Sequence, residues 1–292
     1  MGCASSIEFI NMKYALSIIL LIFSVSVSAE IFKCKEKDGK LRFSDKPCTK
    51  GATQEKLEVK SKETDWVSSS ISNIELNYSV KVFYQYNAVK YFPPEWLNPP
   101  IDARGEQISE SEVGNLIPII EDFLAVYPKN IIEKNLKEIY LLGDLNFYGK
   151  RFGATYSAKG LYIKSEGSAK GFTKLFLLSQ LHSEFSSILM RNYTFPMEAW
   201  SQLNPVGFNY SGNGVEVIEN IDLFSSEENL LKNGFLVIYS KSSLENDFNM
   251  ISFWLFTRPS ELKALCINHE ILRKKVVLAI EFYRSIGIRV SI

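Results

Sequence analysis

From Leu181 to Leu189 the chain reads Leu181-His182-Ser183-Glu184-Phe185-Ser186-Ser187-Ile188-Leu189. This segment lies within a helical pattern that extends from Thr173 to Arg191. At about 100° per residue, the leucines, Phe185 and Ile188 fall on one stripe, which we expect to face the core. The opposite side carries a phenylalanine and several serines in place of charges. A helix with small polar residues on its outer side packs closely on a neighbour or lines a cleft.

Two ionisable residues flank the apolar stripe of this helix. Glu184 has Leu181 and Ile188 as helical neighbours, so we expect it to be partly desolvated, which raises the pKa of a carboxyl group. Glu184 is therefore the candidate catalytic residue. His182 lies at the other edge of the stripe. A lone histidine beside an apolar face is either a hydrogen-bonded core residue or a ligand, and both interpretations stay open.

The segments around this helix alternate between strand and helix patterns. A capping box of Ser109 and Glu112 predicts a helix toward Tyr127, and the apolar run at 138–143 predicts a strand that is covered on both faces. Further strands are expected over 74–84, 152–157, 160–163 and 235–239, and further helices over 247–256 and 272–286. This order predicts one mixed α+β domain over residues 73–292.

The arrangement resembles the region around the His-Glu-x-x-His helix of gluzincin metallopeptidases. The resemblance covers about residues 130–260. It rests on the hairpin that ends in Gly160-Leu161-Tyr162-Ile163, on the segment 181–189, and on the acidic-Phe segment Glu245-Asn246-Asp247-Phe248-Asn249. It implies a zincin-like fold, with Glu184 at the general-base position and the segment 245–249 offering the third metal ligand.

The chain departs from the gluzincin pattern at the zinc ligands. In register with the motif, Ser183 and Ser187 stand at the two histidine positions, and the whole chain has only two histidines. Catalytic zinc needs three good protein ligands and one open position, and serine hydroxyls are poor zinc ligands at neutral pH. The motif therefore keeps only its general-base position.

An improvised metal site would have to use His182, Asp247 and Glu245 near Glu184. Residues 182 and 184 diverge by about 200° on an α-helix, so both cannot face one ion without distortion. We therefore expect a non-catalytic binding or structural module on a metallopeptidase-like scaffold, without a cofactor. The alternative is a zinc-dependent or atypical hydrolase that acts on peptides or cell-wall material with Glu184 as general base.

Residues 1–29 have the pattern of a secretory signal peptide. The apolar run at 14–27 has the length of a signal core and is shorter than the ~20 residues of a spanning helix. Lys13 precedes it, and Val27-Ser28-Ala29 predicts cleavage before Glu30. Met12 offers an alternative start. The expected location is the periplasm or the exterior; a retained signal anchor is the alternative, and would be the one link to a membrane.

Residues 30–50 predict a small β-hairpin. Apolar and polar residues alternate over 31–35 and 41–44 around an Asp-Gly turn. A hairpin alone is marginal in water. Cys34 and Cys48 flank it, and in an oxidising compartment their pairing would contribute about 3 kcal/mol; two free thiols are the alternative. Residues 29–34, 38–40 and 43–48 resemble domain-of-unknown-function family 4124, which implies an envelope location.

The composition limits the classes of function. With 46% hydrophobic and 13% aromatic residues, the chain can bury a full core. The chain has a net charge of zero and a pI near 6.8, so it lacks the excess of basic residues that is typical of nucleic-acid-binding proteins. Residues 51–72 are rich in Lys, Ser, Thr and Glu and predict a linker. The expected partner is an envelope protein or peptide, not a nucleic acid.

Overall fold

The computed structural model describes residues 31–36, 39–44, 46–48, 50–51, 53–57, 62–212 and 226–292. The chain divides into two compact units, Met1–Lys60 and Ser61–Ile292. The predicted signal peptide, residues 1–29, lies outside the described residues. Within the described ranges, no helix combines the length and the apolar character needed to cross a bilayer.

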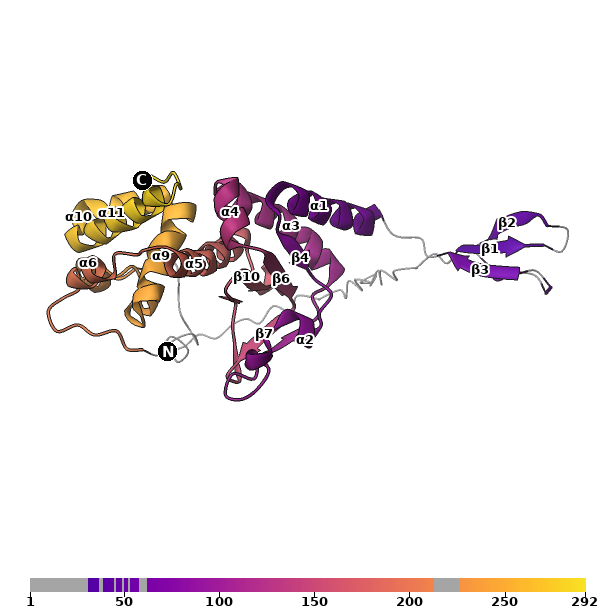
Figure 1. Cartoon of the computed structure of the whole chain (residues 1–292), viewed down its shortest axis with the longest axis horizontal. Helices are drawn as coiled ribbons and strands as arrows, with labels where there is room; N and C mark the ends of the chain where they lie inside the picture. Colours follow the sequence, from indigo (N-terminus) through magenta and orange to yellow (C-terminus); the bar gives the residue numbers. More distant parts are fainter. Residues whose placement is uncertain are drawn as a thin grey trace, which may run out of the picture. The chain divides into compact units, whose positions relative to one another are not determined.

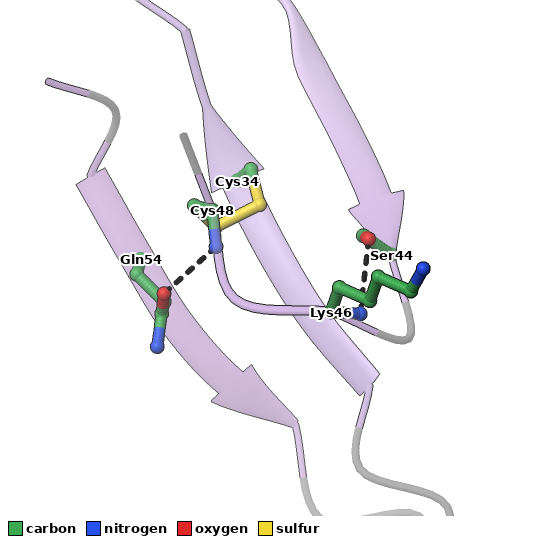
Figure 2. The surroundings of a disulfide bond; sticks show 5 residues. All are labelled: Cys34, Ser44, Lys46, Cys48 and Gln54. Atoms are coloured by element: carbon green, nitrogen blue, oxygen red, sulfur yellow. Dashed lines mark hydrogen bonds between the residues drawn. A yellow bond between two sulfur atoms is a disulfide. The ribbon is translucent and has the colours of Figure 1, made fainter. Parts of the chain in front are cut away.

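The first unit contains a three-stranded antiparallel sheet in the order β2-β1-β3 (Figure 1). Its strands are β1 (Ile31–Lys35), β2 (Leu41–Ser44) and β3 (Thr53–Leu57). The predicted disulfide is confirmed: Cys34 in β1 is bonded to Cys48, with their Cα atoms 5.6 Å apart. The Cys48 backbone N–H donates to the Gln54 side chain of β3 at 2.9 Å (Figure 2). The disulfide and this hydrogen bond hold the segment after the hairpin against both β1 and β3.

The sequence predicts a linker over 51–72, but the structure has strand β3 and the start of helix α1 there. Strand β3 pairs with β1 through the backbone, from Ile31 opposite Leu57 to Lys35 opposite Thr53. Backbone pairing of this kind needs no apolar side chains, so the polar composition of the segment conceals it.

The second unit is a mixed α+β domain, as predicted. A four-stranded sheet has the order β4-β6-β10-β9, and a smaller antiparallel sheet has the order β5-β7-β8. In the larger sheet β4, β6 and β10 run parallel, and β9 is an antiparallel edge strand. The strands of this unit are β4 (Lys81–Phe83), β5 (Arg104–Glu106), β6 (Glu138–Leu142), β7 (Asp144–Phe147), β8 (Lys150–Arg151), β9 (Ala154–Tyr156) and β10 (Gly160–Lys164).

Helix α5 occupies the middle of the second unit (Figure 1). It packs along α9 and also contacts α3, β9 and β10. Helices α1, α3 and α4 lie on one side of it with the larger sheet, and α6, α9, α10 and α11 gather on the other. The helices are α1 (Lys62–Tyr78), α2 (Ala88–Tyr91), η1 (Pro94–Trp96), α3 (Glu110–Ala125), α4 (Lys129–Asn135), η2 (Ser168–Lys170), α5 (Lys174–Asn192), α6 (Met197–Gln202), α8 (Glu228–Lys232), η3 (Ile238–Lys241), α9 (Leu244–Thr257), α10 (Pro259–Asn268) and α11 (Glu270–Ser285).

The helices predicted over 109–127, 173–191, 247–256 and 272–286 are confirmed as α3, α5, α9 and α11. Side-chain caps begin three of them, because the oxygens of Ser109, Thr173 and Ser243 each accept the backbone N–H three residues further on. Gly287, with φ of +90°, follows the end of α11 in the left-handed conformation that glycine adopts readily.

Two predicted strands are wrong. Over 74–84, the alternation of Ile74, Leu76 and Tyr78 suggests a strand, but α1 continues to Tyr78 and only Lys81–Phe83 is extended. Val67 and Ile74 are buried at helical spacing whereas Leu76 is 77% exposed, so the helical period decides this segment. Over 235–239, residues 235–237 are buried and irregular, and η3 begins at Ile238.

Candidate functional site

Helices α5 and α9 face each other through polar residues one turn apart. Ser183 and Ser187 lie on the same side of α5, and Glu245 and Asn249 lie on the same side of α9. The Asn249 Nδ2 donates to the Ser187 hydroxyl at 2.7 Å, and the Ser183 hydroxyl donates to the Asn249 carbonyl at 3.5 Å. These contacts are buried, so they occupy both serine hydroxyls within the protein.

A cavity of about 430 Å³, called here the cleft, lies at this junction. It is bounded by the edge strand β9, helix α5, the start of α9 and the turn η3. Its polar lining includes Ser183, Glu184, Ser187, Glu245 and Asn249. The serine positions of the sequence motif and its general-base position therefore lie together in one cavity.

Glu184 lines the cleft and is half-buried. Removal of water raises the pKa of its carboxyl group to about 8, and the neighbouring charge of Glu245 adds to the effect. Glu184 makes no hydrogen bond or ion pair with any residue that the structure describes. At neutral pH its carboxyl group is therefore mostly protonated, and no described residue forms a hydrogen bond or ion pair with it.

Glu245 is the second carboxyl group of the cleft. The Tyr156 hydroxyl, on the edge strand β9, donates to Glu245 Oε1 at 2.5 Å. Arg191 lies 3.9 Å from the other carboxylate oxygen, and its guanidinium group stacks 4.7 Å from the centre of the Tyr156 ring. Glu245 is thus held by α5 and β9 together, whereas Glu184 is not held.

His182 does not line the cleft. It follows Leu181 on the buried side of α5, where its Nδ1 lies 2.7 Å from the Tyr127 hydroxyl and its ring stacks on Phe256. Burial lowers its pKa to about 3, so the ring is neutral. The structure places His182 as a hydrogen-bonded core residue, which is one of the two interpretations that the sequence left open.

Asp247 also lies away from the cleft, two residues and about 200° around α9 from Glu245. Its Oδ2 accepts from Lys275 at 2.6 Å, and from Trp200 and Tyr210 at 2.9 Å each. Burial raises the pKa of Asp247 and lowers that of Lys275, and the charge of each partner opposes the shift of the other. Asp247 therefore ties α9 to α11.

Of the predicted site residues, the structure brings together Glu184 and Glu245 and separates both from His182 and Asp247. Sequence reasoning missed Tyr156 and Asn249. A signal for Asn249 exists, because it lies one helical turn after Glu245, as Ser187 lies one turn after Ser183. No local pattern indicates Tyr156, whose contact with Glu245 joins residues far apart in the chain.

Helix α5, the edge strand β9 and helix α9, which carries Glu245, surround one cavity, and this is the arrangement of a zincin-like metallopeptidase fold. Residues 59–284 match the family described as "Putative zinc-binding metallo-peptidase", and the chain belongs to this family. Residues 18–65 match the family described as "Domain of unknown function (DUF4124)". Both resemblances predicted from the sequence are thus confirmed.

One solved structure supports the fold. It is described as a "putative zinc-binding metallo-peptidase" from Bacteroides caccae, is 13% identical, and superimposes with a TM-score of 0.52 over 80% of this chain and 89% of that chain. At this identity the likeness shows the fold alone. Comparison with curated proteins finds no match.

The zinc named in the family description does not fit the donors of the cleft. Ser183 and Ser187 stand where the resemblance to gluzincins would place imidazole ligands, and both hydroxyls are engaged by Asn249. Within the described ranges, no three His, Cys, Asp or Glu residues are grouped as a metal site. Zinc prefers nitrogen and sulfur ligands in a tetrahedral set, and this all-oxygen set offers neither.

Proposed function

We propose that the chain is an exported envelope protein that uses the cleft to bind a ligand and does not catalyse zinc-dependent hydrolysis. The observation that carries this proposal is the contact of Asn249 with both Ser183 and Ser187. Through this contact, the residues at the two ligand positions of the metal motif join α5 to α9. The cavity beside this contact stays available for an envelope peptide or protein segment.

Export is supported by the Cys34–Cys48 disulfide, which is compatible with an extracellular or periplasmic location, because disulfides persist in oxidising compartments. The predicted signal peptide and its cleavage before Glu30 supply the route. N-terminal sequencing of protein recovered from the periplasm tests this part, and recovery of the intact N-terminus with membranes would contradict it.

The proposal of a non-catalytic cleft is tested by incubating the purified mature protein with zinc, removing loosely bound ions and measuring metal by mass spectrometry. We expect no stoichiometric zinc and no hydrolysis of a mixed peptide library. One tightly held zinc per chain, together with peptide cleavage, would contradict the proposal.

A second function, hydrolysis with Glu184 as general base, is favoured by one observation: Glu184 lines the cleft and is bonded to no described residue. A general base must be deprotonated, and the pKa of Glu184 is about 8. Hydrolysis by this residue would therefore rise as pH increases through 8 and disappear in Glu184→Gln. A hydrolytic activity that survives in Glu184→Gln would eliminate this function.

A further inference from the structure

The cleft combines acidic groups with an aromatic lining. Glu184 and Glu245 supply the carboxyl groups. The aromatic side chains of the lining come from β9, from the segments before β9 and before α5, and from α5 and η3; they are Phe152, Tyr156, Phe172, Phe176 and Tyr239. A ligand that fills this cavity needs an apolar body and a group that satisfies the carboxyl groups.

The basic residues of the cleft do not satisfy Glu184. Lys164 is 6% exposed at its side chain and lies 2.7 Å from Asp144 and 2.8 Å from Glu166. Arg151 lies 3.6 Å from Asp144 and is 71% exposed. Both cations are thus directed to acidic groups outside the cleft, and Glu184 is left without a cation among the described residues.

Asn249 gives a second, independent sign of a missing donor. It is 5% exposed and lines the cleft, and its Oδ1 is buried without a hydrogen-bond partner among the described residues. A buried amide oxygen without a donor costs on the order of 1–3 kcal/mol. Beside Glu184, the described lining of the cleft therefore holds one buried acceptor without a donor, the Asn249 Oδ1.

We propose that the cleft binds a primary ammonium group, carried by a ligand with an apolar or aromatic body, against Glu184 and Glu245. This inference rests on the proposed function, in which no metal occupies the cleft. An ammonium group offers three donors and no acceptor, which complements carboxylates, and its apolar body fits the aromatic lining. The ammonium group is that of a peptide N-terminus or of a lysine side chain.

Binding by this route exchanges a proton. The protonated Glu184 carboxyl group gives its proton to solvent and becomes the carboxylate that faces the ligand's ammonium group, so no covalent bond to the ligand forms. The titratable groups around Glu184 are Glu245 from α9, Tyr156 from β9 and Tyr239 from η3, with Arg191 of α5 beside Glu245. Burial keeps both tyrosines neutral, so the exchanged proton comes from Glu184.

The test compares benzylamine with benzyl alcohol and benzoate, as the matched neutral and anionic probes, by calorimetry and NMR titration of the full mature chain at pH 7. We expect benzylamine to bind about tenfold more tightly than benzyl alcohol, a difference of about 1.4 kcal/mol, and to release a proton. In Glu184→Gln the preference should disappear. In Glu281→Gln, an exposed residue of α11 outside the cleft, it should stay.

Equal binding of benzylamine and benzyl alcohol would overturn the inference and leave the ligand-binding cleft standing. If none of the probes binds, the inference is also overturned. It is overturned as well if calcium binds with higher affinity than benzylamine and if this calcium binding is lost in Glu184→Gln. Zinc content is measured separately, so failure of the proposed function is distinguishable. Two peptides identify the source: one with a free N-terminus and no lysine, and one N-acetylated with a single lysine.

Discussion

Glu184 is a carboxyl group whose environment favours the neutral form. Its pKa is about 8 in the folded chain, far above its usual value of 4.5, because water is removed around it and Glu245 lies nearby. Between these two pH values the folded protein holds a proton that the unfolded protein has lost. Stability therefore falls as pH rises from 4.5 to 8.

Glu184→Gln should remove this penalty. We expect the variant to match the native protein at pH 4.5 and to exceed its free energy of unfolding by on the order of 3 kcal/mol at pH 8. Urea denaturation at the two pH values measures this, with Glu281→Gln as the control. A constant difference between variant and native protein across this range would show that Glu184 is not held neutral.

His182 gives the opposite pH dependence. Burial lowers its pKa to about 3 from 6.5, so its contribution to stability is present above pH 6.5 and is lost as pH falls toward 3. His182→Gln should be less stable at pH 7, because it loses the contact with Phe256. Its stability should however decline less than that of the native protein between pH 6.5 and 4.5, by about 2 kcal/mol. Parallel declines in thermal or urea unfolding would contradict this.

Among the helices, α9 contacts a different neighbour on each of its two sides. The side with Glu245 and Asn249 faces α5 and the cleft, and the side with Asp247 faces α11. The sequence predicts α5 and α9 from apolar period and caps, and it places Ser183 and Ser187 in the metal motif. It cannot predict that Asn249 engages them, because that contact depends on how the two helices are packed.

Lys275 should be essential for the packing of α9 against α11. Both Lys275 and Asp247 are fully buried, so removal of the ammonium group leaves a buried carboxyl group without its cation. We expect Lys275→Met to lower the free energy of unfolding by about 3–5 kcal/mol. The matched control is Lys274→Met, because Lys274 pairs with Glu270 at the surface; it should cost less than about 1 kcal/mol. If both variants lost a similar amount of unfolding free energy, Lys275 and Asp247 would not act as a buried ion pair.

The failures of sequence prediction at this scale have two causes. Over 74–84, the apolar residues fit both the two-residue period of a strand and the period of a helix. The burial of Val67 and Ile74, which are seven residues apart, agrees with the helix. Over 53–57, strand β3 is specified by its backbone pairing with β1, which leaves little trace in the side chains. The strands β6 and β10 were predictable because their apolar runs are buried in the sheet.

At the scale of the whole molecule, the two units have separate cores. The main core consists of residues from 67 to 288, whereas Phe32 and Cys34 are the buried apolar residues of the described part of the first unit. A sheet of three short strands with so few buried side chains depends on its cross-link. The α+β class and both family resemblances could be predicted from the sequence, because each rests on local motifs.

Reduction of the Cys34–Cys48 disulfide should destabilise the first unit by about 3 kcal/mol, because the cross-link joins residues 14 positions apart and restricts the unfolded chain. Hydrogen exchange measured by mass spectrometry should accelerate in β1 and β3 after reduction and stay unchanged in β6, which belongs to the other unit. Protection of β1 that survives reduction would show that the sheet does not need the disulfide.

The proposed function requires that the cleft of the native chain holds no zinc, and this is tested by measuring metal content. The native chain and Ser183→His/Ser187→His are to be loaded with zinc, washed and measured together by mass spectrometry. The variant places two imidazoles one helical turn apart on α5, opposite Glu245. We predict about one zinc per chain in the variant and none at stoichiometric level in the native chain. One zinc per native chain would contradict the proposed function.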